Sequence, residues 1–133
     1  MIRRIAREIV LQSLFQIDFS GCDAAGALEA SLAEHEEKDA AKAKAYAEKT
    51  LNGVLEHQEE VDAKISQYAI DWTVERMSAT DRNILRIAVY EMMFAEEKIV
   101  PGVAINEAVE IAKRYGTEES PRFINGILGK MVR

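Results

Sequence analysis

Apolar residues recur at steps of three and four along nearly the whole chain, and this spacing constrains the fold more than any other feature. In residues 2–17 they form one broad stripe, which predicts an amphipathic helix. The apolar pattern predicts further helices over about 24–34, 40–55, 59–69 and 81–95. Only two prolines and seven glycines interrupt the 133 residues. This composition favours helices over a β-sandwich or barrel.

Small, glycine and proline residues mark the helix ends in the second half of the chain. Ser78 and Thr80 are both suitable N-caps for the helix at 81–95, and the sequence does not choose between them. Pro101-Gly102 predicts a turn before the next helix, and Tyr115-Gly116 predicts its end at a glycine cap. Ser120-Pro121 predicts an N-cap followed by proline at the first position of a last helix.

These elements predict an all-α protein of about seven helices in two packed bundles, without strands. We expect one compact domain over residues 1–133, with an amino-terminal half of about 1–70 and a carboxy-terminal half of about 71–133. The helix at 81–95 is apolar on most sides, which is typical of a central, buried helix. Trp72, the only tryptophan, is expected to fill the junction between the halves.

The charge of the chain is unevenly distributed. The net charge is −6, whereas general nucleic-acid binders are usually basic. Residues 1–7 nevertheless carry three arginines and no acid, and residues 113–133 carry five basic and two acidic residues. The stretch 23–62 holds eleven acidic and four basic residues. The two basic ends either form an RNA surface or merely solvate the protein.

The first helix places arginine beside apolar residues on one side. Arg4 and Arg7 are predicted to point away from the apolar stripe, together with Leu11 and Phe15. Two explanations remain open at this stage. Another helix covers this side, or the side is a surface for a base or a partner protein.

Several classes of protein find no support in the sequence. The single cysteine, Cys22, excludes an internal disulfide and a cysteine-based zinc site. Neither His35 nor His57 has a second histidine at helical ligand spacing, and no Gly-x-Ser-x-Gly motif occurs. We therefore expect no enzyme, no metal and no cofactor. Without a secretory signal or an apolar run of about 20 residues, we also expect a cytoplasmic protein without a membrane segment.

Three segments stand in a characteristic order and spacing. They are Arg3-Arg4-Ile5-Ala6-Arg7-Glu8 with its continuation to Gln16, Asp81-Arg82-Asn83-Ile84-Leu85-Arg86-Ile87-Ala88-Val89-Tyr90-Glu91-Met92, and the stretch from Ala104-Ile105-Asn106-Glu107-Ala108 to Phe123-Ile124-Asn125-Gly126-Ile127-Leu128. Together they resemble the NusB family of bacterial transcription antitermination factors. The resemblance extends over nearly the whole chain.

This resemblance implies a fold of about seven helices and a function in transcription. Family members pair with NusE, which is also a small-subunit ribosomal protein, and the pair binds the single-stranded boxA element of ribosomal RNA operon transcripts. With RNA polymerase and other Nus factors, the pair makes elongation resistant to termination. Family members can also form homodimers through the RNA surface, and no reaction is catalysed.

The resemblance also implies roles for particular residues. The RNA-binding residues carried over to this chain are Arg3, Arg4, Arg7, Lys113, Arg114, Tyr115, Arg122 and Asn125. Guanidinium groups suit this role because they neutralise phosphates and stack on bases. Phe15 and Asp81 are expected near the NusE contact, where an acidic protein suits a basic partner. Asn125 either reads a base edge or caps a buried backbone group, and Phe123 is either a core residue or a stacking platform.

Two rival functions remain. The same helical module occurs fused to an RNA cytosine methyltransferase, and a chain of this length could then only be a fragment. The other rival is a helical adaptor that binds proteins only, with its arginines serving solubility. The few basic residues predict modest RNA affinity and a shallow dependence on salt.

Overall fold

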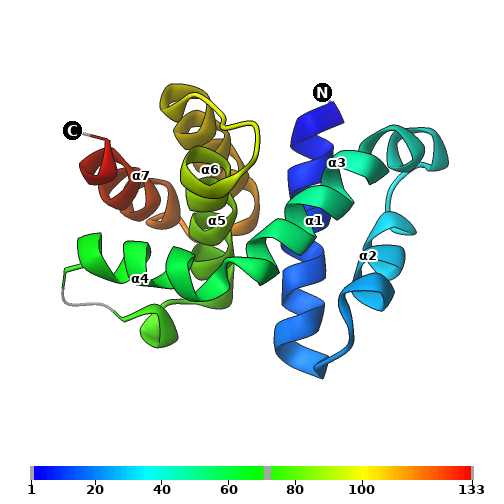
Figure 1. Ribbon diagram of the computed structural model, residues 1–133, viewed down its shortest axis with the longest axis horizontal. Coiled ribbons are helices and arrows are strands. Elements are labelled where there is room, and N and C mark those ends of the chain that lie inside the picture. The colour runs from blue at the N-terminus through cyan, green and yellow to red at the C-terminus, as the bar shows by residue number, and fades with distance from the viewer. Residues whose placement is uncertain (1, 71–72, 133) are drawn as a thin grey trace.

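The computed structural model describes residues 2–70 and 73–132, and within them it contains seven α-helices and no strand (Figure 1). The helices are α1 (Ile2–Ser20), α2 (Ala24–Leu32), α3 (Glu37–Glu56), α4 (Gln58–Tyr68), α5 (Ala79–Val89), α6 (Pro101–Tyr115) and α7 (Ser120–Met131). A 3₁₀ turn, η1 (Val74–Arg76), precedes α5, and a π-helical turn, η2 (Tyr90–Phe94), follows it. The predicted all-α fold is confirmed. The prediction for Trp72 lies outside the described residues.

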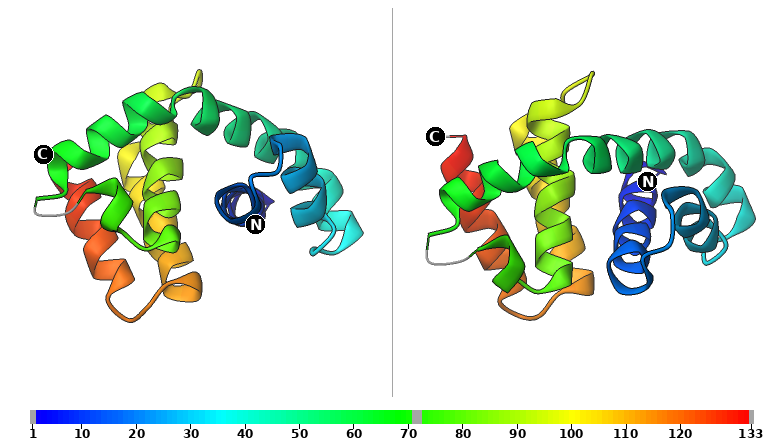
Figure 2. Two further views of the ribbon diagram at one scale, coloured as in Figure 1. Left: turned by 90° about the horizontal axis from the view of Figure 1, so that it is seen from below. Right: turned by 60° about the horizontal axis from the view of Figure 1, so that its bottom comes forward.

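The helices form two groups that α3 connects. Helix α1 packs against α2, α3 and α5, while α6 and α7 pack against each other and against α5. Helix α3 extends from α2 across α1 towards α5 (Figure 2). Helix α4 packs on α5 and α7, where Val61 and Ile65 are completely buried. In space α4 therefore packs with the carboxy-terminal helices α5 and α7.

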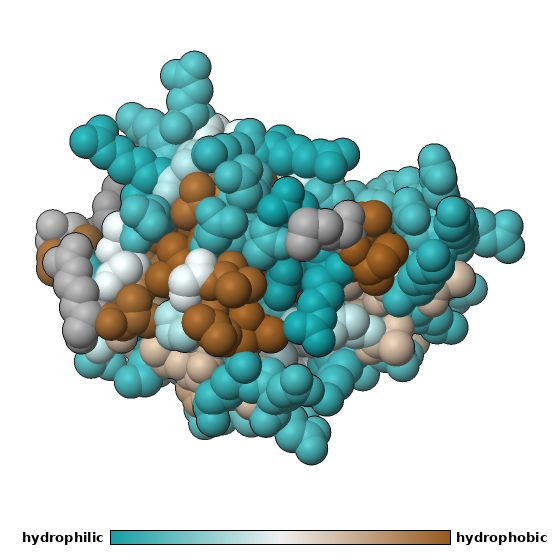
Figure 3. Space-filling view, turned by 90° about the horizontal axis from the view of Figure 1, so that it is seen from above, coloured by the Kyte–Doolittle hydropathy of each residue, from teal (hydrophilic) through white to brown (hydrophobic). Residues whose placement is uncertain are grey.

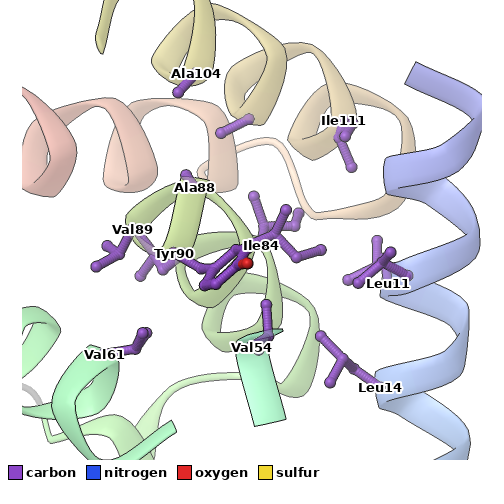
Figure 4. Packing of buried hydrophobic residues seen from close by; sticks show 14 of the residues in the cluster. Leu11, Leu14, Val54, Val61, Ile84, Ala88, Val89, Tyr90, Ala104 and Ile111 are labelled. Carbon is purple, nitrogen blue, oxygen red and sulfur yellow. The ribbon is translucent and has the colours of Figure 1, made fainter. Parts of the chain in front are cut away.

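One apolar core runs through both groups. Leu11 and Leu14 of α1 point towards Ile84 of α5, and Val54 of α3 lies beside them (Figure 4). Every residue of α1 from position 6 to position 11 is buried. Arg7 and Leu11 thus face the interior, on the side of α1 for which the sequence left two explanations open. Of the two explanations for Leu11, cover by another helix is correct.

The structure also decides how α5, α6 and α7 begin or end. Ser78 is the N-cap of α5, because its Oγ accepts a hydrogen bond from the Asp81 N–H at 3.1 Å. Helix α6 ends at Gly116 as predicted, and a Cβ there would collide with the side chain of Ser120. Ser120 is not the N-cap of α7 but its first residue, and its buried Oγ accepts from the Thr117 N–H at 2.9 Å. The serine thus closes the loop before α7.

The predicted helix at 81–95 changes its winding at Tyr90. Helix α5 ends at Val89, and in the wider turn that follows, the Ala95 N–H donates to the Tyr90 carbonyl at 2.8 Å. Such π-turns are rare and frequent at functional sites. Glu91 of this turn is 3% exposed. The turn therefore holds a carboxylate inside the molecule, opposite α1.

Candidate nucleic-acid interface

Arg3 and Arg4 lie at the beginning of α1, where part of each side chain reaches the solvent. Arg3 is exposed, and its guanidinium lies 4.7 Å from the centre of the Tyr46 ring. The Arg4 side chain is 38% exposed, and its Nε donates to Glu107 Oε2 on α6 at 3.1 Å. The hydrogen bond to Glu107 and the charge of that carboxylate raise the pKa of Arg4. Both guanidinium groups remain accessible to the solvent.

Arg7, one turn further along α1, is enclosed. It is 3% exposed, and its Nε lies 2.9 and 3.0 Å from the two carboxylate oxygens of Glu91. Its Nη1 lies 3.4 Å from Glu107 Oε1. Burial alone would lower the pKa of Arg7, but the hydrogen bond and charge of Glu91 outweigh it, so the pKa is raised. The guanidinium of Arg7 is therefore engaged inside the protein and not presented on the surface.

Tyr46 of α3 completes this buried ion-pair network. Its hydroxyl donates to Glu91 Oε2, and Arg3 covers its ring from outside. Burial and the hydrogen bond to Glu91 raise the pKa of Tyr46 to about 12. The network joins α1, α3, η2 and α6, so it fixes the position of the first turns of α1.

A second ion pair of reversed polarity joins α1 to α6. Glu8 of α1 is buried, and its Oε2 accepts a hydrogen bond from Arg114 Nη1 of α6 at 3.0 Å. The Arg114 side chain is nevertheless 68% exposed, and its guanidinium lies 5.5 Å from the centre of the Tyr115 ring. We call the line marked by Arg4–Glu107 and Glu8–Arg114 the α1–α6 seam. It brings the two basic ends of the sequence together.

The remaining predicted residues of the basic surface lie around α6 and α7. Lys113 is exposed and pairs with Glu110 at 3.3 Å, and Tyr115 is half-buried. Arg122 and Asn125 are exposed on α7, where they line a shallow groove against α6. Because Asn125 is exposed, it does not cap a buried backbone group. Phe123 is half-buried against the core, which is the alternative that its apolar neighbours favoured.

The two residues expected near a partner lie in different helices, Phe15 in the second half of α1 and Asp81 in the first turn of α5. Phe15 is half-buried, and Asp18, one turn later, accepts hydrogen bonds from Arg82 and Asn83 of α5. Asp81 lines a hollow of about 190 Å³ together with Arg76 and residues of the α6–α7 connection. Its Oδ1 is buried and has no hydrogen-bond partner among the described residues. The structure thus places Phe15 and Asp81 near the same end of the α1–α5 contact.

The surface near Arg4 is not uniformly basic. Val100 and Val103, where α6 begins, are 66% and 51% exposed. Figure 3, which looks down on the top of Figure 1, shows apolar side chains gathered among hydrophilic ones. The face therefore combines the arginines of the α1–α6 seam with exposed apolar side chains.

Sequence reasoning missed the acidic residues that hold the arginines. Between 84 and 106 positions of sequence separate these arginines from their partners Glu8, Glu91 and Glu107. Helical spacing alone therefore cannot pair them. It also missed Asn106, which faces the same groove as Asn125. The only available signal for Asn106 was its place on the polar side of α6.

Metal and membrane functions find no support in the described ranges. No group of three or more His, Cys, Asp or Glu side chains there is arranged to hold a metal ion. Within residues 2–70 and 73–132, no helix is both long and apolar enough to span a bilayer.

Comparisons with known proteins agree on one family. The model of the NusB family matches residues 4–133. The chain is 45% identical to a transcription antitermination protein NusB of Symbiobacterium thermophilum, over 100% of this chain and 90% of that protein. The solved structure of T. maritima NusB superimposes with a TM-score of 0.85 at 42% identity, covering 97% of this chain and 89% of the other.

A further solved structure contains partners. It is the crystal structure of the antitermination factors NusB and NusE in complex with dsRNA, and it superimposes with a TM-score of 0.81 at 26% identity. The match covers 98% of this chain and 95% of that chain.

Proposed function

This chain belongs to the NusB family, and on that premise we propose that it is a transcription antitermination factor that binds boxA single-stranded RNA together with NusE. In this role it promotes processive transcription of ribosomal RNA operons. It acts by binding and catalyses no reaction. RNA polymerase and other Nus factors complete the assembly in the cytoplasm.

The observation that carries the proposal is the α1–α6 seam. Two ion pairs of opposite polarity link α1 to α6 while Arg4 and Arg114 stay partly exposed. Arginines that are fixed in this way lose less conformational entropy when they bind phosphate. A relative in complex with NusE and RNA supports the same assignment.

Within this proposal the basic residues have two roles. The exposed cations neutralise RNA phosphates; they are Arg3, Arg4, Lys113, Arg114 and Arg122. Arg7 does not contact the RNA itself. Its ion pairs with Glu91 and Glu107 position the first turns of α1. Tyr115, which is half-buried beside Arg114, offers a ring on which a base can stack.

The partner surface lies around Phe15 and Asp81. The carboxylate of Asp81 lines the hollow beside η1 and suits a cationic side chain of NusE, and Phe15 offers apolar contact area. The net charge of −6 favours association with a basic ribosomal protein. A homodimer formed through the RNA surface would compete with RNA.

The test is fluorescence anisotropy of labelled boxA RNA, with and without NusE. We compare the wild type with an Arg3→Ala, Arg4→Ala double variant, because Arg7→Ala would disturb the fold. A Lys42→Ala, Lys44→Ala double variant is the matched control, since it removes the same charge from exposed positions of α3. Five exposed cations predict a slope of log affinity against log salt of about −3.5 at most, and the arginine variant should flatten it by about 1.4.

Binding that is modest alone, tighter with NusE and weakened only in the arginine variant supports the proposal. If the folded wild type binds no boxA RNA under either condition, the protein-only adaptor replaces it. If both double variants lose the same RNA affinity, the arginines act only through the net charge of the protein. The α1–α6 seam would then have no specific role in RNA binding.

A further inference from the structure

A shallow groove between α6 and α7 lies apart from the α1–α6 seam. It encloses roughly 520 Å³ and is lined by Gly102, Ile105, Asn106 and Val109 of α6 and by Pro121, Arg122 and Asn125 of α7. Its lining combines apolar residues with two amides and one guanidinium. Among the residues that the structure describes, no carboxylate lines it. The groove therefore suits a flat ligand with polar edges and a negative charge close by.

The two groove amides have no structural task. Asn106 and Asn125 are exposed, and neither side chain makes a hydrogen bond with another residue of the described chain. Asn83 offers the contrast: it is completely buried, donates to Asp18 at 2.9 Å and accepts from Arg86 at 3.0 Å. Asparagine is a poor helix former, so two of them inside helices do not stabilise α6 or α7. Their donors and acceptors are available to a ligand.

The chemistry of an unpaired nucleobase matches this groove. A primary amide presents a donor beside an acceptor, which is the pattern that reads a base edge. The apolar lining residues offer contact to the flat face of the ring, and Arg122 of the same lining can meet the adjoining phosphate. A peptide would also use the amides, but it would not need the guanidinium, and the absence of carboxylates favours a polyanion.

We propose that this groove is a subsite in which Asn106 and Asn125 read one unpaired base of the RNA while Arg122 binds the adjoining phosphate. This inference rests on the proposed function and adds Asn106 to the residues that determine RNA specificity. The α1–α6 seam then supplies sequence-independent attraction, and the α6–α7 groove supplies selectivity.

The experiment measures the anisotropy of labelled boxA RNA, with NusE present, for a series of RNAs that each lack one base. The variants are Asn106→Ala, Asn125→Ala and their combination. In the wild type, removal of the base that occupies the groove should weaken binding roughly ten-fold. In the double variant the intact RNA should bind roughly ten-fold more weakly, and removal of that same base should then cost nothing further.

Gly102→Leu offers a steric test that leaves both amides in place. A Cβ at Gly102 would meet no atom within 4 Å, so the backbone there can carry a leucine, whose side chain would occupy the end of the groove. It should abolish the same base-specific penalty. Gly129→Leu is the matched control, because Gly129 also faces open space but does not line the groove. Asn52→Ala, an exposed asparagine of α3, is the control for the amides.

The slope against salt distinguishes the two roles. The alanine variants of the asparagines should leave it unchanged because an amide carries no charge, whereas Arg122→Ala should flatten it by about 0.7. Penalties for base removal that are the same in wild type and double variant would overturn the subsite while the proposed function stands. Loss of NusE binding with unchanged RNA binding would assign the groove to the protein partner and overturn the proposal. A wild type that binds no boxA RNA would overturn both.

Discussion

Arg4 and Arg7 show how two carboxylates give neighbouring arginines different tasks. Glu107 pairs with both, but only Arg7 also reaches Glu91, and its exposure falls to 3%. A buried guanidinium is tolerated only when its charge and its donors are satisfied, and Arg7 meets both conditions. Its contribution is therefore to the position of α1.

Arg7→Ala should lower the free energy of unfolding by about 3–5 kcal/mol, because it leaves Glu91 buried without its cation. Urea denaturation followed by circular dichroism measures the change. Arg3→Ala is the control, since Arg3 is exposed and only covers the Tyr46 ring, and it should cost less than about 1 kcal/mol. A loss below 1 kcal/mol for Arg7→Ala would contradict the structural role.

Tyr46 should make stability depend on pH in the alkaline range. Its pKa is raised to about 12 in the folded protein, whereas a phenol in the unfolded chain has a pKa of about 10. The folded state therefore keeps a proton that the unfolded state loses first. The resulting stabilisation is complete below about pH 10 and is lost as the pH rises through about 12.

Tyr46→Phe removes this phenol, so its stability should fall less steeply than that of the wild type between pH 10 and pH 12. Urea unfolding at several pH values measures both curves, and the absorbance of tyrosinate gives the titration directly. Tyr46→Phe will be less stable at pH 8 because Glu91 loses a donor, so the slopes are the quantity to compare. Parallel curves would refute the assignment.

At the scale of elements, the turn η2 and helix α3 depend on each other. Gly53 of α3 is buried, and a Cβ at this position would overlap the ring of Tyr90, the first residue of η2. The absence of a side chain at Gly53 therefore allows the Tyr90 ring to lie close to the α3 backbone, although glycine lowers the helix propensity of α3. This approach lets η2 lie against α3 while Glu91 reaches α1.

Gly53→Ala should destabilise the protein by about 1–3 kcal/mol, since the overlap with Tyr90 exceeds the gain in helix propensity. Gly129→Ala in α7 is the opposite case. Its Cβ would meet open space, so it should stabilise the protein by up to about 1 kcal/mol. Thermal unfolding of the two variants side by side gives both signs, and a stabilising Gly53→Ala would show that Tyr90 moves aside freely.

At the scale of the whole molecule, α3 connects the two groups into one cooperative unit. The core is continuous from α1 through α3 and α5 to α7, and Leu51 of α3 is only 1% exposed within it. Small domains with a single core usually unfold in one transition. The two groups should therefore lose their structure together.

Leu51→Ala should cost about 2–5 kcal/mol and still leave a single transition. Far-ultraviolet circular dichroism and amide hydrogen exchange of α2 and α7 should give the same loss of stability. Lys44→Ala on the exposed side of α3 should change stability by less than about 0.5 kcal/mol. Earlier loss of protection in α2 than in α7 would mean that the two groups unfold separately.

Local patterns determined the helices of this protein but not how each one packs. The apolar periodicity placed all seven helices, because a helix must bury its stripe wherever it lies in the molecule. It could not decide whether the side of α1 that carries Arg7 and Leu11 is covered, because that cover depends on helices that come later in the chain. From the sequence, Ser78 and Thr80 were equally suitable N-caps. Only the backbone geometry before α5 shows that Ser78 is the cap.

The sequence alone determined an all-helical fold and an arginine-rich first helix that resembles the NusB family. Only the tertiary structure decided which arginines face the solvent and that Asn106 and Asn125 share a groove. The physical reason is the range of the interactions. Helix formation depends on neighbours within about four residues, whereas the carboxylates that enclose Arg7 lie 84 and 100 positions away and approach it only when the core has formed.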